Sequence, residues 1–187
     1  KIKSFFETNH IDILVNNTQG PAAGGALEKS IDDYQSAFDL LFKCAVKTSL
    51  LALSSMKDKK WGRIINVASI SVKEPLNYLV LSNSLRSALV TWSKTLSVDI
   101  AKFNITINNV LTGYFNTERL KELNSKKAEK LGIKISKIED TIKETIPMKR
   151  FGKPEEYANL VCFLASDKSD YITGTNIPID GGHMKSL

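Results

Sequence analysis

Three side chains that can bind or polarise an oxygen atom lie close together in the middle of the chain. Ser69 follows a strand-like segment, residues 63–68, and Ser82 and Arg86 lie on the helical stretch after it. Since residues four apart share a helix face, Arg86 is expected one turn beyond Ser82 on the same side. Two hydroxyl groups and a fixed cation are suited to an oxygen-bearing substrate, a carboxylate or sugar hydroxyl groups. The spacing therefore indicates a binding site.

The elements that must position these side chains alternate between strand and helix. Strands are predicted at residues 11–15, 63–68, 105–111 and 176–180, and helices at 30–56, 79–101 and from Pro154. Such an order builds a parallel sheet with right-handed crossovers, and ligands of these sheets bind beyond the carboxyl ends of the strands. Asn16, Ser69 and Gly113 each follow a predicted strand. We therefore expect an α/β fold in which these three residues converge at one edge of the sheet.

The first predicted strand, residues 11–15, is nearly all apolar, as is typical of an interior strand covered on both faces. Almost nothing precedes it to supply a neighbouring strand. Because a bare apolar edge favours pairing with another chain, we expect further sequence or a partner on that side.

Composition favours a single globular domain and argues against several classes of function. The chain has 187 residues, of which 42% are hydrophobic and 25% charged, enough for one large core. No apolar run approaches the length of a membrane span and no secretion signal is recognisable, which predicts a cytoplasmic protein without a membrane partner. Cys44 and Cys162 lie in apolar helical patterns without metal-ligand spacing, so we expect buried free thiols and no metal site.

The formal net charge of +6 raises the question of a nucleic-acid partner. The lysines are dispersed, and those between residues 121 and 137 are interleaved with acidic residues. Solvated helix faces explain this pattern better than a binding footprint, which would cluster on one face. The sequence therefore predicts no nucleic-acid partner.

Several short motifs occur in an order and spacing that are jointly specific. They are Asn16-Asn17 after a strand, Asn66-Val67-Ala68-Ser69, Thr112-Gly113 with Thr117, and a C-terminal series at Pro147, 150–152, 154–156, 163–166, 173–174 and 180–182. Together they resemble the short-chain dehydrogenase/reductase family, and its 3-oxoacyl reductases in particular, over essentially the whole chain. The resemblance implies a Rossmann-like, doubly wound parallel sheet. The glycine-rich turn that opens the family's fold is absent, so residues 1–187 are interpreted as one N-terminally incomplete domain that begins at the fourth strand.

The resemblance also implies an activity and a set of site residues. The activity would be hydride transfer between NAD or NADP and a small carbonyl or alcohol substrate. Ser69 takes the place of the catalytic serine, whereas Ser82 and Arg86 stand where the family has its tyrosine and lysine, and Leu41 stands where it has an asparagine. The catalytic residues implied are Ser69, Ser82 and Arg86, and the cofactor-binding residues are Asn16, Arg86, Gly113, Phe115 and Thr117.

The replacements weaken proton transfer more than binding. A phenol with a pKa of about 10 can be tuned into a proton donor, whereas an alkyl hydroxyl is far less acidic and arginine stays protonated. Ser82 would act directly or through water, and a helix-capping role for it remains open. Tyr78, four residues earlier, offers another phenol if the helix begins early. A catalytically silent binding or scaffold protein is the alternative function.

Two further expectations concern regions outside these positions. The Lys-rich stretch that follows Gly113, up to about residue 143, is weakly amphipathic and is interpreted as a mobile lid that would determine substrate specificity. The helical patterns at 33–56 and 81–100 resemble the family's subunit interface, which implies a homodimer or homotetramer.

Overall fold

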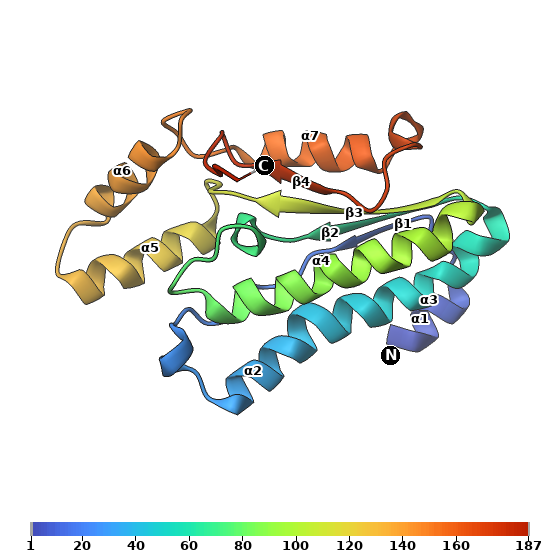
Figure 1. Ribbon diagram of the computed structural model, residues 1–187, viewed down its shortest axis with the longest axis horizontal. Coiled ribbons are helices and arrows are strands. Elements are labelled where there is room, and N and C mark those ends of the chain that lie inside the picture. The colour runs from blue at the N-terminus through green and yellow to red at the C-terminus, as the bar shows by residue number, and fades with distance from the viewer. Residues whose placement is uncertain (1, 187) are drawn as a thin grey trace.

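The computed structural model describes residues 2–186 and consists of a four-stranded parallel sheet with helices on both faces (Figure 1). The strands lie in the order β1, β2, β3, β4, with bounds Ile13–Asn16, Gly62–Val67, Ile105–Thr112 and Asn176–Ile179. The longer helices are α3 (Cys44–Lys59), α4 (Val80–Ile100), α5 (Glu118–Leu131), α6 (Ile135–Thr145) and α7 (Pro154–Leu164). The predicted α/β class with a parallel sheet is confirmed. A start at the family's fourth strand stays a prediction.

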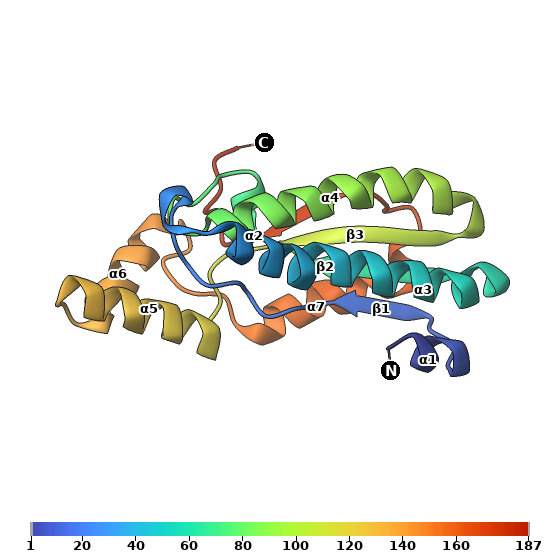
Figure 2. The same ribbon diagram turned by 90° about the horizontal axis from the view of Figure 1, so that it is seen from below.

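Alternating side chains of the central strands build a separate core on each face of the sheet. Ile64 and Ile107 are fully buried in a cluster with residues of α3 and α4. Ile65 and Val110 point the other way and pack with Leu164 of α7. Apolar residues on both faces of a strand are what a doubly covered parallel sheet requires. The two views agree that α3 and α4 lie on one face and α7 on the other (Figures 1 and 2).

The helix predicted from residue 30 to 56 is interrupted in the middle. It comprises α2 (Ile31–Ala37), a π-helical segment (Phe38–Lys43) and α3. Its predicted start is confirmed, because the Ser30 hydroxyl accepts the Asp33 amide at 3.2 Å and the Asp33 carboxylate accepts the Ser30 amide at 2.9 Å. The short α1 (Ile2–Thr8) packs beside α3.

One asparagine from each strand forms a continuous ladder across the sheet. The Asn16 amide donates to Asn66 at 2.8 Å, Asn66 donates to Asn109 at 2.9 Å, and Asn109 donates to Asn176 at 2.8 Å. Asn66 also donates to Ser93 of α4 at 2.9 Å, so the ladder ties the sheet to a helix. Since buried amides are costly when unpaired, the ladder fixes the register of the four strands.

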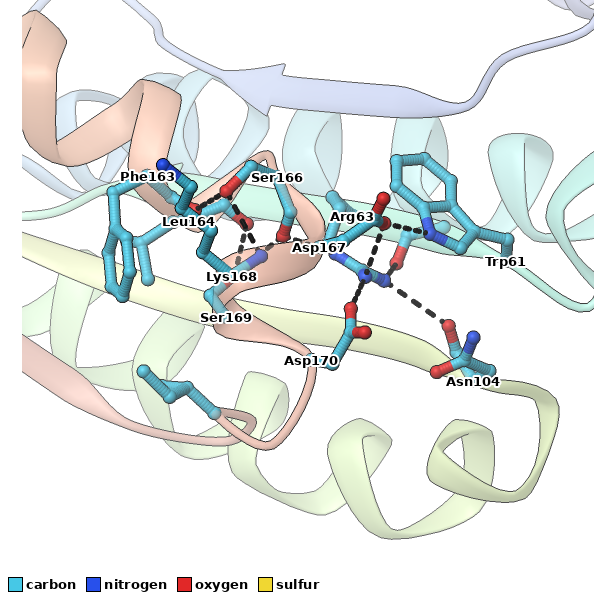
Figure 3. Close-up of polar contacts among 12 residues, drawn as sticks. Trp61, Arg63, Asn104, Phe163, Leu164, Ser166, Asp167, Lys168, Ser169 and Asp170 are labelled. Carbon is cyan, nitrogen blue, oxygen red and sulfur yellow. Dashed lines mark hydrogen bonds and ion pairs between the residues drawn. The ribbon is translucent and has the colours of Figure 1, made fainter.

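A buried cation closes the opposite, amino-terminal end of the sheet (Figure 3). Arg63 of β2 is fully buried, forms an ion pair with Asp170, and donates to the carbonyl of Asn104 at 3.3 Å. The Trp61 ring lies 4.3 Å from the guanidinium carbon, and its indole donates to Asp167 at 2.8 Å. These contacts attach the segment after α7 to β2, far from the strand ends where ligands of such sheets bind.

Strand β1 lies at an edge in the part of the chain that the structure describes. It pairs with β2 alone, and Ile13 and Val15 are 46% and 41% exposed. The apolar sequence that suggested an interior strand therefore has one face and one edge uncovered within residues 2–186. The expectation of a neighbour on that side stays a prediction.

The cysteines differ from expectation. Both are free thiols, but Cys162 is exposed and Cys44 is only half-buried, so the predicted burial is wrong. Cys162 lies on α7, which buries Leu164 against the sheet and leaves its outer face to solvent. Among residues 2–186, no helix has the length and apolar character of a membrane span, and no group of side chains suits a metal ion.

Candidate functional site

The carboxyl ends of β2 and β3 open into a cavity of about 750 Å³. Its wall comes from segments 22–24, 69–70, 76–79 and 112–117 and from one face of α5. Figure 1 shows α5 and α6 extending beyond this end of the sheet, so the stretch interpreted as a lid consists of two helices. Four predicted site residues, Ser69, Gly113, Phe115 and Thr117, line the cavity.

The Ser69 hydroxyl oxygen is held in place by one hydrogen bond that it accepts. It lies directly beyond β2, and its Oγ accepts the amide of Ser71 at 3.1 Å, capping the short 3-10 helix Ile70–Val72. Among the described residues it has no acceptor for its own proton. The hydroxyl group can therefore donate to an oxygen atom in the cavity while its position stays fixed.

Gly113, Phe115 and Thr117 turn the chain from β3 into the cavity wall. A Cβ at Gly113 would lie 2.7 Å from the Asp180 Cα, so only glycine fits beside the end of β4. The Thr117 hydroxyl accepts the Leu120 amide at 3.3 Å and caps α5. Phe115 is buried, with its ring 5.2 Å from that of Tyr157. Their cofactor-binding roles stay predictions.

Ser82 and Arg86 are absent from the residues that line the cavity. Each is 8% exposed, on the first two turns of α4. Arg86 donates from Nη1 to the carbonyl of Val67, two residues before Ser69. Burial lowers the pKa of Arg86, and the nearby Tyr157 opposes that shift. Ser82 does not cap α4, whose N-cap is Leu79, so the capping alternative is wrong.

Asn16 is engaged in holding the sheet together. Its amide donates to Asn66 and, at 3.0 Å, to Ser49 of α3, and its carbonyl accepts from Thr48 at 2.7 Å. These three bonds use the donors and one acceptor site of the side chain. Asn16 is the last residue of β1, so its place at a strand end is as predicted, but it does not line the cavity and its contact with a cofactor stays a prediction.

Two tyrosines, Tyr78 and Tyr114, also line the cavity. Tyr78 is 40% exposed, and the Lys127 ammonium lies 5.5 Å from the centre of its ring. Burial, and then the neighbouring Tyr78, raise the pKa of Tyr114 above its ordinary value. Tyr114 therefore keeps its proton, and Tyr78 is the more accessible phenol. In the sequence, the position of Tyr78 two residues before α4 was the feature that indicated this second phenol.

The donor set fits one end of a nicotinamide dinucleotide. Beyond its bond to Val67, Arg86 forms no further hydrogen bond among the described residues, so it keeps donors for ribose hydroxyl groups, but the side chain is 8% exposed and a cofactor must approach it from outside the cavity lining. Ser69 lies beyond the end of the same strand. Within residues 2–186 we find no glycine-rich turn of the kind that cradles a pyrophosphate. The fit therefore concerns the nicotinamide end alone.

Comparison with known proteins gives a consistent result. A family model described as enoyl-(acyl carrier protein) reductase matches residues 3–184. The NADPH-dependent reductase BacG of Bacillus subtilis is 36% identical over 187 residues, which cover all of this chain and 71% of BacG. The 3-oxoacyl-[acyl-carrier-protein] reductase FabG of Rickettsia felis is 31% identical over 178 residues, which cover 93% of this chain and 68% of FabG.

Solved structures of reductases superpose on the whole chain. YwfH, an NADPH-dependent reductase involved in bacilysin biosynthesis, superposes on the whole chain with a TM-score of 0.93 at 34% identity. L-sorbose reductase from Gluconobacter frateurii, solved with NADPH and L-sorbose, also covers the whole chain, with a TM-score of 0.92 at 29% identity. The matched part is 74% of the first chain and 73% of the second.

Proposed function

Because this chain belongs to the short-chain dehydrogenase/reductase family, we propose that it is an NAD(P)-dependent oxidoreductase acting on a small carbonyl or alcohol. The observation that carries the proposal is the Ser69 hydroxyl, fixed by Ser71 and free to donate into a cavity at the strand ends. A bound nicotinamide supplies or accepts the hydride. BacG and the sorbose reductase favour NADPH over NADH.

Ser69 has the role of polarising the substrate oxygen. As hydride reaches the carbonyl carbon, negative charge develops on that oxygen. A pre-positioned donor stabilises the charge without reorganising, and loss of one such donor typically lowers kcat by about 10²- to 10³-fold. The bond from Ser71 supplies the positioning, since it fixes the oxygen of Ser69 while leaving its proton available.

Tyr78 is the better supported source of the proton. Ser82 lies outside the cavity wall, so it would act only through a water molecule, and its alkyl hydroxyl is a weak acid. Tyr78 lines the cavity and has a phenol that solvent can reprotonate, because it is 40% exposed. In the reductive direction the proton passes from the Tyr78 hydroxyl to the substrate oxygen, and water restores it.

Arg86 has a positioning role and a binding role. Its bond to the Val67 carbonyl steadies the end of β2, and with it the approach to Ser69. Its other guanidinium donors have no partner among the described residues and would hold the ribose hydroxyl groups of the cofactor. Gly113, Phe115 and Thr117 would border the nicotinamide, and Asn16 supports this edge of the sheet.

Turnover of a carbonyl panel tests the proposal. The purified protein with NADPH should reduce at least one ketone or aldehyde, and Ser69→Ala should lower kcat/KM by about 10²-fold because one oxyanion donor is lost. Ser84→Ala is the matched control, since Ser84 is exposed on α4. Equal activity of Ser69→Ala and the unaltered protein would remove Ser69 from the mechanism.

A catalytically silent scaffold is the second candidate. It is motivated by Leu41, Ser82 and Arg86, which replace three of the four residues expected in the family. It predicts no hydride transfer with any member of the panel, and activity created by Ser82→Tyr combined with Arg86→Lys. Activity of the unaltered protein would contradict it.

Assembly into a homodimer or homotetramer is also proposed. Phe38, Leu40 and Leu50 are 37%, 37% and 54% exposed on the helical unit formed by α2, the π-helical segment and α3. Phe42 and Val46 line a groove on the same surface. An apolar patch of this kind is typical of a subunit interface. A cytoplasmic location, where nicotinamide cofactors are available, completes the proposal.

A further inference from the structure

The cavity wall formed by α5 is strongly basic. Arg119, Lys126, Lys127 and Lys130 all line the cavity, and their spacing places them along one side of the helix. Glu28 is the one acidic side chain among the described residues that line it. The Gly25 amide, and after it Lys130, lower the pKa of Glu28, so that carboxylate is already engaged. The cavity therefore carries an excess of positive charge.

These cations are poorly compensated by the protein itself. Arg119 lies 3.6 Å from Glu122 and donates to the Pro21 carbonyl at 3.0 Å. Lys126 and Lys127 form no ion pair within residues 2–186. On the sequence alone this Lys-rich helix was interpreted as a solvated face. Its position over the cavity changes that interpretation.

A buried amide in the same wall also lacks a partner. Asn124 is 3% exposed and lines the cavity, and its Nδ2 has no hydrogen-bond partner among the described residues. Leaving a buried donor unpaired costs about 1–3 kcal/mol, so such a group usually has a ligand or water to satisfy it. Rotation about the Cβ–Cγ bond presents either end of the amide to the cavity. The unpaired Asn124 amide is therefore a second, independent indication of a polar ligand at the α5 wall of the cavity.

Most of the remaining cavity wall is apolar, which limits the kind of anion the cavity can take. The apolar lining includes Ile70, Leu76, Leu79, Leu120 and Leu123. A ligand that fills it must have a hydrocarbon body between its reactive end at Ser69 and its charged end at α5.

We propose that the cavity selects a carbonyl substrate with an apolar body and a terminal oxyanion, a carboxylate or a phosphate, bound by Asn124 and the lysines of α5. This inference rests on the proposed function for the position of the carbonyl at Ser69, but recognition of the anion needs no turnover. Its oxyanion accepts from the Asn124 amide, and Lys126 and Lys127 supply the charge.

Calorimetric binding without cofactor tests the proposal with octanoate, octyl phosphate and octanamide as probes. At least one anion should bind about tenfold more tightly than octanamide, and Lys126→Gln with Lys127→Gln should remove that advantage. Asn124→Leu, of similar volume, should weaken anion binding and spare octanamide. Lys121→Gln is the control, because Lys121 pairs with Glu118 at 2.8 Å and lies outside the cavity.

The outcomes separate this inference from the proposed function. Equal affinity for octanamide and both anions, or the same loss from Lys121→Gln as from the double variant, would overturn it. The tighter of octanoate and octyl phosphate identifies the oxyanion. Selective anion binding by a protein that reduces no ketone would contradict the proposed reaction and leave the anion site standing.

Discussion

Ser69 and Tyr78 are the two residues whose chemistry decides between turnover and binding alone. Both line the cavity, whereas Ser82 and Arg86, at the positions of the family's tyrosine and lysine, do not. A phenol is more acidic than an alkyl hydroxyl by several pKa units, so the proton donor is expected to be Tyr78. At this scale the family register located Ser69 correctly at a strand end. It gave no information about which side chains reach the cavity, because that depends on the packing of α4 and α5.

Comparison of the two single variants Tyr78→Phe and Ser82→Ala tests which side chain donates the proton. Tyr78→Phe should lower kcat by about 10²-fold, the typical contribution of a general acid, while Ser82→Ala should change it less than threefold. Tyr171→Phe is the control, since Tyr171 is fully exposed outside the cavity. A larger loss in Ser82→Ala than in Tyr78→Phe would return the role to Ser82.

The elements of the fold were predictable where local signals are strong. The Ser30 and Asp33 capping box and the Pro154 start of α7 are local hydrogen-bonding features, and both occur as expected. The π-helical segment at Phe38–Lys43 was not revealed by the sequence pattern. The break between α5 and α6 lies at Gly132, which ends α5 in the left-handed conformation, so a local signal for it was present in the sequence. The pattern did not reveal the asparagine ladder, because that requires the register between strands.

The ladder predicts a large loss of stability for Asn66→Ala. Asn66 accepts from Asn16 and donates to Asn109 and Ser93, so its removal takes a partner from the buried Asn109 and Ser93 and from the half-buried Asn16. We expect the free energy of unfolding, measured by urea denaturation, to fall by about 3 kcal/mol. Asn176→Ala, at the exposed end of the ladder, should cost less than half as much. A loss below about 1 kcal/mol for Asn66→Ala would show that the ladder contributes little.

The first turn of α7 predicts a pH dependence. The Arg150 guanidinium and the Lys153 amide lower the pKa of Glu156 from 4.5 to about 2. Because the folded-state pKa is depressed, this contribution is fully present above pH 4.5 and is lost as the pH falls through about 2. Glu156→Gln should therefore flatten the dependence of stability on pH between these limits, measured by thermal unfolding. Glu155→Gln should not, and equal profiles for Glu156→Gln and the unaltered protein would contradict the assignment.

The overall architecture of the molecule was predictable from a small number of sequence features. Apolar strands followed by small or polar residues predicted a parallel sheet with its ligand site at one end, and that arrangement is present. The buried Arg63 was not predictable, because its partner Asp170 lies 107 residues away in the sequence. The edge position of β1 leaves Ile13 and Val15 exposed within residues 2–186, which keeps the expectation of a neighbour there.

Leu50→Lys tests the proposed assembly through the surface of α2, the π-helical segment and α3. Leu50 is 54% exposed on α3, so a charge at this position should not affect the monomer core. In a multimer that uses this surface, a buried unpaired ammonium would be costly, and the protein should elute as a monomer in size-exclusion chromatography with light scattering. Lys47→Glu, on the same groove, should weaken assembly less. An unchanged mass for Leu50→Lys would exclude this surface as the interface.

The central claim is that this member of the family transfers hydride although Ser82 and Arg86 replace the usual pair. The most direct measurement is mass spectrometry of the alcohol formed from a reducible ketone with NADPH deuterated at the nicotinamide C4. We expect one deuterium on the carbinol carbon, with a rate that falls about 10²-fold in Ser69→Ala. Absence of labelled product from every carbonyl compound, with the cofactor bound, would contradict it.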